Sequence, residues 1–436
     1  MRLAARISVI FLFTSNGLLA HPPEDAADEN LEEVVVEGRR QDLIGQVRSA
    51  SEGVIGQEQL ELRAISRPGD VMEAIPGLIM TQHSGSGKAN QMYLRGFNLD
   101  HGTDFATFID NMPVNMRTHG HGQGYTDINF LIPELIRTIE YVKGPYHAEL
   151  GDFSSAGGAQ IHTYRELPQN RLTASVGENG YLRGLAASSS GFGPGVLLGA
   201  IETTEYDGPW TDINEDARKF NGVLRYSGDN PNMEWDVLFK LYDASWNSAD
   251  QIPTRAVASG LIDPFGSLDT TVGGETRRAS GSADLNWNST YAANHINAYI
   301  IDYELQLWSN FTYLLDDPVN GDQFEQLDRR TIYGGEWRSD WISGASNGHL
   351  HHHSGIQLRY DDISAVGLFN TRDRQRLSTT RLDSVDEFSI GAWYELEWLL
   401  SDELTAVLGV RADYYHFEVD SDNPANSGDT SDSLVS

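Results

Sequence analysis

The sequence predicts a membrane all-β protein, in which an antiparallel transmembrane β-barrel follows a smaller α/β domain. Two observations carry this prediction. From residue 171 onward, apolar and polar residues alternate with the period of two that places them on opposite faces of a strand. The connections between these strands alternate between short turns and long loops, as outer-membrane barrels require. A soluble sandwich or propeller would also show alternation, but nothing in such a fold sorts the connections by length.

The composition narrows the class of protein. The chain has 436 residues, with 63 Asp and Glu against 31 Lys and Arg, and a net charge of −32. This charge argues against nucleic acid as a partner, because phosphate binding needs a basic surface. The chain contains no cysteine, which excludes disulfides and thiolate metal sites. Beyond the N-terminal segment, no apolar run approaches the ~20 residues of a membrane-spanning helix.

Residues 1–20 are typical of a signal peptide. Arg2 and Arg6 form its positive start, residues 7–13 form its apolar centre, and Ala20 is a small residue at a plausible cleavage point. We therefore expect the protein to be exported.

Residues 21–40 are predicted to be a flexible periplasmic tether, because their first half is acidic, contains proline and lacks apolar periodicity. A short β-branched stretch near the end of the tether can add a strand to the sheet edge of a partner. An ordinary first strand of the next domain explains the same residues equally well. The stretch consists of Glu32, Glu33, Val34, Val35, Val36 and Glu37.

Residues 41–166 mix short strands and short helices. Residues 68–75 are predicted to start a helix that Pro76-Gly77 ends, and residues 132–136 are predicted to form a helical turn. Four further blocks are each typical of a short strand closed by a glycine, proline or Asp-Asn turn. These blocks are LRGF at 94–97, FIDNMPV at 108–114, VKGP at 142–145 and GGAQIHT at 157–163.

Residues 167–436 are expected to form part of the barrel. About eleven strands are predicted, whereas single-chain barrels close with an even number so that no edge is open in lipid. The last strand runs into residues 420–436, which should be a long connection. We therefore expect a sequence truncated at its C-terminus, with about half a barrel present. The predicted strands are 171–177, 181–190, 196–206, 219–227, 233–246, 277–289, 291–305, 331–342, 349–361, 385–399 and 404–419, and the predicted long connections are 207–218, 247–276, 306–330 and 362–384.

The order of these motifs resembles the TonB-dependent outer-membrane receptors. The stretch at 32–37, the Arg-Gly, Asp-Asn and Lys-Gly-Pro turns, and Gly157-Gly158 follow one another as in that family, with long strands beyond. The resemblance implies an N-terminal α/β plug domain, residues 41–166, inside an antiparallel transmembrane barrel of roughly 22 strands. The chain departs from the usual pattern at residues 149–152 and 157–161, which makes assignment to a subgroup unsafe.

The resemblance also implies an activity and a location. It implies active uptake of a scarce ligand across the outer membrane of a Gram-negative bacterium, driven by the inner-membrane TonB complex. Residues 32–37 would then be the TonB box. We expect a monomer in contact with outer-membrane lipid, without enzyme activity and without a required cofactor. A passive porin or surface-binding barrel is the alternative from another class, but it would not need residues 31–165.

Two basic residues are candidates for a lock between plug and barrel. Arg95 and Lys143 belong to the Arg-Gly and Lys-Gly-Pro turns. The family resemblance supports a role as buried cations that pair with lumen-facing carboxylates; such pairs are specific but add little net stability. The alternative is that both lie at exposed strand ends.

A His-Gly-His segment is the candidate ligand site. His119 and His121 can point to the same side of the backbone, and neutral imidazole is a good ligand for zinc, copper and nickel. The family pattern places this segment at the outer apex of the plug, where His83 and His101 could join it. The favoured substrate is therefore a transition metal or metal chelate, bound as cargo. The alternatives are a loop whose histidines hydrogen-bond locally or shape a siderophore pocket, with ferric siderophore, haem and cobalamin as possible ligands.

A second histidine run, from His349 to His353, follows a short turn and should lie at the periplasmic end of the wall. The period of two places His349, His351 and His353 toward the lumen, with His352 on the lipid face. A solvated wall is the preferred interpretation of this run.

Overall fold

A computed structural model describes residues 46–82, 85–344, 350–401 and 403–436. The predicted signal peptide, the stretch from Glu32 to Glu37, and the side chains of His83 and His349 lie outside the described residues. Among the residues that are described, no helix is long and apolar enough to cross a membrane.

The N-terminal domain contains two small sheets, and β6 and β9 of the larger sheet pair in parallel. The predicted helix at 68–75 and the helical turn at 132–136 form as the 3-10 helices η1 (Pro68–Ala74) and η2 (Pro133–Leu135). The larger sheet has the order β1 (Gln46–Ser49), β2 (Glu52–Gly56), β8 (Ile136–Val142), β9 (Gly157–Thr163), β6 (Phe105–Ile109) and β7 (Met112–Pro113), the smaller one has β3 (Leu78–Thr81), β4 (Gln91–Leu94) and β5 (Phe97–Asn98), and α1 spans Gln57–Glu61.

This domain has its own apolar core. Phe105 and Ile109 of β6, Ile139 of β8 and Ile161 of β9 are at most 1% exposed, and Met72 of η1 is fully buried beside them. Burial of such side chains contributes about 1.5–3 kcal/mol each. The short strands therefore form one rigid unit although none of them is long.

The second part of the chain is a single antiparallel sheet of twelve strands, which we call the wall. Each strand pairs with the next one in the sequence, so the order in space equals the order in the chain. The strands are β10 (Arg171–Val176), β11 (Leu182–Phe192), β12 (Gly195–Tyr206), β13 (Ala217–Asn230), β14 (Met233–Asn247), β15 (Gly273–Asn288), β16 (Ala293–Ser309), β17 (Phe324–Ser343), β18 (Leu350–Arg372), β19 (Gln375–Ser401), β20 (Leu404–Ser421) and β21 (Gly428–Val435).

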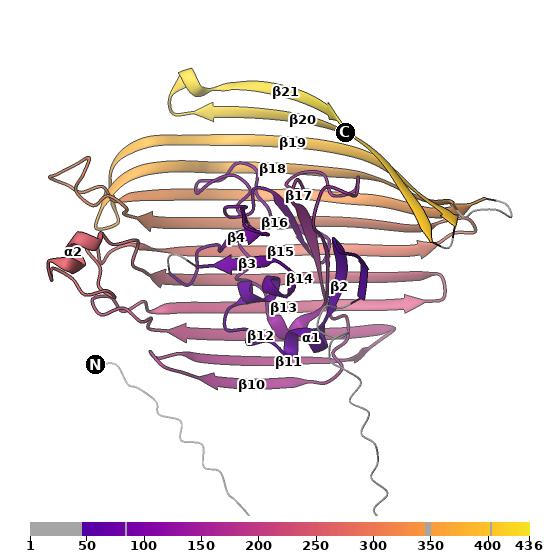
Figure 1. The fold of residues 1–436 in the computed structure, drawn as a ribbon, viewed down its shortest axis with the longest axis horizontal. Helices are drawn as coiled ribbons and strands as arrows, with labels where there is room; N and C mark the ends of the chain where they lie inside the picture. The colour runs from indigo at the N-terminus through magenta and orange to yellow at the C-terminus, as the bar shows by residue number, and fades with distance from the viewer. Residues whose placement is uncertain (1–45, 83–84, 345–349, 402) are drawn as a thin grey trace, which may run out of the picture. The chain divides into compact units, whose positions relative to one another are not determined.

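Long and short connections lie at opposite rims of the wall, as the sequence predicts (Figure 1). The connection between β14 and β15 is the longest and contains α2 (Thr254–Ala258) at the rim drawn on the left. Short turns such as residues 193–194 and 231–232 lie at the other rim.

Two predictions about the connections are wrong. Residues 362–384 are not a long loop, because β18 and β19 extend through them and meet in a tight turn at Asp373-Arg374, where both residues have positive φ. A twelfth strand, β21, forms inside the segment predicted to be a loop. Residues 375–381 and all of β21 are exposed on both faces, so no buried inner face imposes an alternation that the sequence could display.

The two faces of the wall differ in polarity. In β14, Phe239 and Leu241 are exposed on the outer face, whereas Asp236 and Lys240 are buried on the inner face. Leu238 breaks this alternation because it packs inward against Met112 of β7. The outer face therefore suits lipid and the inner face suits a polar neighbour.

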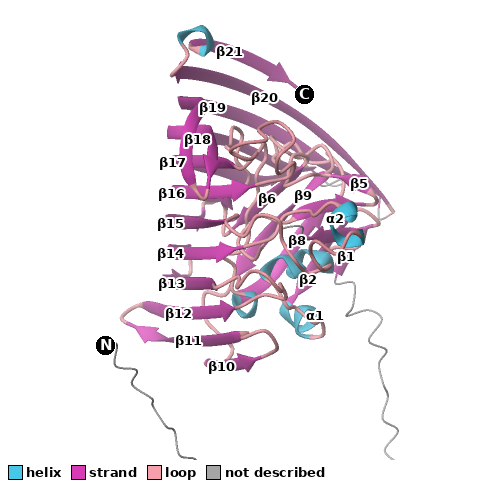
Figure 2. Cartoon of the chain, turned by 90° about the vertical axis from the view of Figure 1, so that its left-hand side faces the viewer, coloured by secondary structure: helices cyan, strands magenta, loops and turns pink. Residues whose placement is uncertain are grey.

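That neighbour is the N-terminal domain. It lies against the inner face of the curved wall, and the wall strands run behind β6, β8 and β9 (Figure 2). Many polar side chains of the wall point toward it and are buried by it. The contact between the two parts therefore depends mainly on hydrogen bonds and charges.

Candidate functional site

Asp110 is the centre of a buried anchor between the N-terminal domain and the wall. It follows β6 in the left-handed backbone conformation, with φ 48°, and its side chain is 3% exposed. Lys240 of β14 donates to Asp110 Oδ2 at 2.6 Å, and Arg225 of β13 donates to Oδ1 at 3.1 Å. Burial opposes ionisation of Asp110, but the two cations hold its pKa below the ordinary value. We call Asp110, Lys240 and Arg225 the anchor.

Arg225 also holds the end of β9, where the chain leaves the N-terminal domain. Its Nη1 atom donates to the carbonyl oxygens of Thr163 at 3.0 Å and Tyr164 at 2.8 Å. Its Nε atom pairs with Asp236 Oδ2 at 2.8 Å. The anchor therefore fixes the domain to β13 and β14 beside its covalent junction with the wall.

Sequence reasoning did not single out the anchor, although Asp110 lies in the quoted FIDNMPV turn. One signal was present, because Lys240 occupies the polar phase of a strand whose other face is apolar. The partner of that lysine lies 130 residues earlier in the chain, and no local pattern specifies such a pairing.

The segment Thr118–His121 is held by β16 and β17. Gly120 N donates to Asp328 at 3.1 Å, and Gln326 Nε2 donates to Gly120 O at 3.0 Å. Arg330 donates to Thr118 O. These contacts bind the backbone of the loop, so they fix its position whatever its side chains do.

Three of the four candidate histidines meet around Tyr125. The ring of His119 stacks on Tyr125 with centroids 4.1 Å apart, and the ring of His121 lies edge-on to it at 5.5 Å. His101 and His121 have centroids 4.7 Å apart. The structure thus brings together His101, His119 and His121, while the side chain of His83 lies outside the described residues.

The surroundings of these histidines keep two of them neutral. Burial lowers the pKa of His119 well below its ordinary value and lowers the pKa of His121 to about 2, and the Arg330 and Lys88 charges act in the same direction. His119 Nδ1 accepts a hydrogen bond from His121 N at 3.0 Å, and its Nε2 lies 3.3 Å from the Tyr303 hydroxyl. Both ring nitrogens of His119 therefore already have partners.

These histidines are not arranged as a metal-ligand set. In the described ranges, no group of three or more His, Cys, Asp or Glu side chains is placed to hold a metal ion. His121 Nδ1 is 2.8 Å from Gln326 Oε1, so its proton lies on that nitrogen and Nε2 carries the lone pair. Neutral rings suit metal binding, but His119 would have to exchange a hydrogen bond first.

Arg95 and Lys143 converge on one turn of the N-terminal domain. Arg95 is exposed with φ 53°, and its backbone N donates to Gly77 O at 2.8 Å. Lys143 is 7% exposed, and its Nζ donates to Pro76 O at 3.4 Å. Burial and the nearby Arg95 charge lower the pKa of Lys143. Within the described part of the chain, neither cation pairs with a carboxylate of the wall, so the predicted lock stays a prediction.

His147 forms a second charged contact with the wall. Its Nδ1 lies 3.0 Å from Glu395 of β19, and its Nε2 lies 3.4 Å from Glu52 of β2. The hydrogen bond to Glu395, together with both carboxylate charges, raises the pKa of His147 to about 9. The imidazolium therefore bridges the domain and the wall at neutral pH.

The second histidine run forms contacts within the wall. His353 Nδ1 lies 2.7 Å from Asp340, on the inner face where it was predicted. His352 stacks on Trp341 with parallel rings 4.9 Å apart and lies 2.6 Å from the Tyr394 hydroxyl. These aromatic and hydroxyl partners explain how a histidine is accommodated on the outer face.

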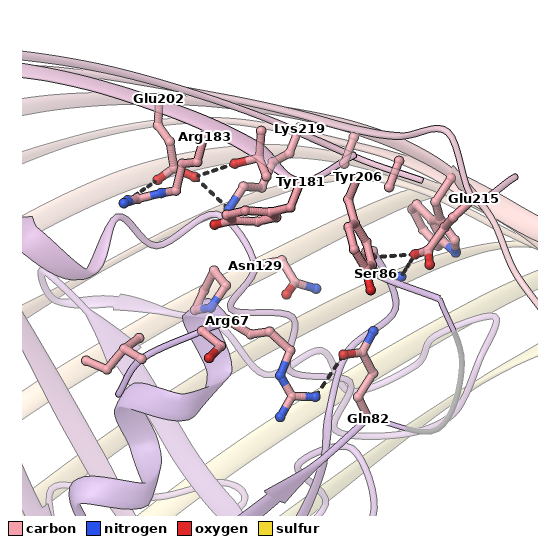
Figure 3. Close-up of a pocket in the computed structure, with 18 of the residues that line it drawn as sticks. Arg67, Gln82, Ser86, Asn129, Tyr181, Arg183, Glu202, Tyr206, Glu215 and Lys219 are labelled. Atoms are coloured by element: carbon pink, nitrogen blue, oxygen red, sulfur yellow. Dashed lines mark hydrogen bonds and ion pairs between the residues drawn. The ribbon is translucent and has the colours of Figure 1, made fainter. Parts of the chain in front are cut away.

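A cavity of about 1160 Å³ lies between the N-terminal domain and β10–β14 (Figure 3). Figure 3 shows Arg183, Glu202 and Lys219 side by side on its wall side, with Asn129 and Arg67 opposite. At one end, Ser86 N donates to Glu215 at 2.7 Å, and the Ser86 hydroxyl donates to the same carboxylate. Its lining carries both signs of charge together with Tyr181, Tyr206, Trp210, Tyr242 and Trp246.

Comparison with known proteins identifies the N-terminal domain. Residues 46–158 match the TonB-dependent Receptor Plug Domain. The described chain as a whole has the fold of TonB-dependent receptors. The N-terminal domain described above is the plug, and the wall is consistent with part of a 22-stranded barrel.

Solved structures share this architecture at low sequence identity. The unliganded ferric citrate transporter FecA aligns over 88% of this chain at 13% identity, with a TM-score of 0.70. The copper transporter OprC aligns over 90% at 16% identity, with a TM-score of 0.66. The ferric yersiniabactin uptake receptor FyuA from Yersinia pestis aligns over 91% at 16% identity, with a TM-score of 0.65. The alignments cover 59%, 60% and 63% of those chains, so this chain spans about three fifths of their length.

Proteins with this plug domain and fold belong to the Gram-negative outer membrane, and the apolar outer face of the wall fits that location. The predicted boundaries at residues 20, 40 and 166 stay predictions.

The anchor can be tested by replacing its charges. We expect Asp110→Asn to weaken plug docking by about 3–5 kcal/mol, because Lys240 would remain buried without its counter-charge. The double variant Asp110→Asn, Lys240→Met should lose less docking free energy than the sum of the losses in the two single variants. Hydrogen exchange of the plug core measures the effect.

Arg165→Met is the matched control for the anchor. Arg165 pairs with Glu234 at 2.7 Å, the two side chains are 38% and 55% exposed, and its Nε lies at the longer distance of 3.8 Å from Asp236, which keeps its 2.8 Å contact with Arg225. Loss of the Arg165–Glu234 pair should weaken plug docking by less than about 1 kcal/mol. Equal effects of Asp110→Asn and Arg165→Met would contradict the role of the anchor.

The contact of His147 should depend on pH. Since its pKa is raised to about 9, the stabilisation is complete below the unfolded-state pKa and is lost as the pH rises through about 9. Wild type should therefore melt above His147→Gln at pH 6 to 7, and the two midpoints should converge above pH 9. A constant difference from pH 6 to pH 10 would show that charge is not the cause.

Proposed function

We propose that this protein carries out TonB-dependent active transport of a metal chelate across the outer membrane. The observation that carries the proposal is a plug held against a polar inner wall by hydrogen bonds and ion pairs. A passive pore gains nothing from such a plug, whereas a gated transporter needs one that can be displaced. Where such polar contacts are partly exposed, water can replace them at little cost.

The choice of a metal chelate follows from the histidine cluster and from proteins of like fold. The similar structures include a ferric citrate transporter, a copper transporter and a ferric yersiniabactin receptor. Both ring nitrogens of His119 are engaged, so a chelate that contacts His121 or His101 requires less rearrangement than direct coordination. A transition-metal ion bound by these histidines is the second candidate, because burial keeps His119 and His121 neutral.

The energy source follows from the same proposal. The inner-membrane TonB complex would bind residues 32–37 and pull on the plug from the periplasmic side. Adding a strand to a partner's sheet suits this β-branched stretch. The lock of Arg95 and Lys143 with barrel carboxylates is also proposed, because the two cations converge beside Pro76-Gly77 and repel each other without a counter-charge.

Deletion of Glu32–Glu37 tests the coupling. We expect the deletion to abolish energised uptake while surface binding stays unchanged, because the box would transmit force and take no part in ligand contact. The probes are zinc, copper and nickel ions, ferric citrate, a ferric catecholate, haem and cobalamin. Undiminished uptake after the deletion would contradict TonB coupling.

The histidine cluster has its own test. His119→Ala combined with His121→Ala should weaken binding of the transported probe about tenfold or more, as loss of a metal ligand or of an oriented polar contact does. The control is His416→Ala, which should bind normally, because His416 lies on β20 and its ring contacts Ser431 of β21. Unchanged binding of every probe by the double variant would remove these histidines from the ligand site.

A further inference from the structure

The wall holds the plug differently on its two sides. From β17 to β20, wall side chains bind backbone carbonyls of the plug. Arg359 donates to Asn115 O at 2.9 Å, Gln357 donates to Glu149 O at 2.9 Å, and Arg411 donates to the same oxygen at 3.2 Å. We call these hydrogen bonds, together with the one that Arg330 donates to Thr118 O, the clamped seam.

The clamped seam is dry as well as polar. Arg330 has no exposed side-chain surface, and Arg359 and Arg411 are each 9% exposed. Asp361 pairs with both Arg330 and Arg359, and Asp413 pairs with Arg411. Moving the plug away here would expose several buried ions together, and each buried charge that loses its partner is costly.

The opposite side, along β10–β14, carries the anchor on β13 and β14 and also contains the cavity. Tyr242 Oη and Trp246 Nε1 are buried in its lining without a hydrogen-bond partner in the described part of the chain. Unpartnered donors in a cavity are available to a ligand or to water. A volume of about 1160 Å³ is larger than typical drug-sized pockets and suits an organic chelate with polar and aromatic contacts.

Two ion pairs cross this side between the plug and the wall. Arg183 of β11 donates to both carboxylate oxygens of Glu134, at 2.7 and 2.8 Å. Arg171 of β10 pairs with Glu61 at the end of α1. The side chains of Arg183 and Glu134 are 13% and 20% exposed, and those of Arg171 and Glu61 are 20% and 50% exposed. A pair with a carboxylate as exposed as Glu61 contributes little to stability, because water replaces the lost partner.

Arg183 has a second partner that remains when Glu134 leaves. Its Nη2 lies 3.1 Å from Glu202 of β12, which is buried and also pairs with Lys219 at 2.6 Å. Separation of Glu134 from Arg183 therefore leaves no unpaired cation in the wall.

We propose that the ligand passes the plug on the β10–β14 side, through this cavity, when the Glu134–Arg183 and Glu61–Arg171 pairs separate. The clamped seam and the anchor hold the rest of the plug in place and serve as the pivot. The proposal rests on the transport function proposed above and adds the route, the two gating ion pairs and the size of the cargo.

The lack of native cysteine makes the route testable with single thiols. Thr204→Cys places a thiol in the cavity lining, and Ser389→Cys places one at the clamped seam, where Ser389 accepts from Arg117. Each change puts a thiol in place of a hydroxyl, and Thr204→Cys also removes a methyl group. A membrane-impermeant maleimide is added to cells that carry the variant and the inner-membrane TonB complex, with and without a protonophore.

We expect energised cells to label Thr204→Cys about tenfold faster than protonophore-treated cells, because labelling follows the population of the open state. Ser389→Cys should change less than about twofold. Addition of Glu134→Gln should speed the resting labelling of Thr204→Cys several-fold and leave Ser389→Cys unchanged, because it removes one gating pair.

Each other outcome has a definite meaning. If energised cells label both thiols equally faster, or only Ser389→Cys faster, the proposed route is wrong while TonB coupling stands. Acceleration at neither thiol would overturn the route together with the proposed function. Acceleration that persists after deletion of Glu32–Glu37 would contradict the coupling alone.

Discussion

The structure depends on one constraint, which is that charges buried between the plug and the wall must be neutralised in pairs. Asp110 meets it by lying between Lys240 and Arg225, where burial alone would disfavour its charge. The turn that presents Asp110 and the strand end at Thr163 are both fixed by these contacts. The position of the whole plug on β13 and β14 follows from this one cluster.

The same constraint explains why the interface is polar. An apolar interface of this size would hold the plug permanently, whereas paired charges can be exchanged for water where they are partly exposed. The wall contacts the plug both through dry charged groups and through partly exposed ion pairs. Dry arginines bind plug carbonyls from β17 to β20, and the partly exposed pairs of Glu134 and Glu61 border the cavity. The exposure of Glu61 and the second partner of Arg183, Glu202, are what make this side suited to open.

Much of the architecture could be predicted because strands impose a local pattern. The alternation of Phe239 and Leu241 with Lys240 in β14 identifies both faces of the wall, and the single exception, Leu238, contacts Met112 of the plug. Prediction failed where that pattern has no physical cause. The outer ends of β18 and β19, and all of β21, are solvent-exposed, so their side chains need not alternate.

The sequence by itself determined the membrane all-β class and the plug with its turn motifs, because each depends on residues close together in the chain. Only the tertiary structure decided the partners of Asp110, the hydrogen bonds that occupy His119 and the cavity beside Arg183. Most of those contacts join residues far apart in the chain, such as Glu134 with Arg183, 49 positions apart, and Asp110 with Lys240, 130 positions apart. Local sequence carries no record of such pairings, because they arise from the way the wall curves around the plug.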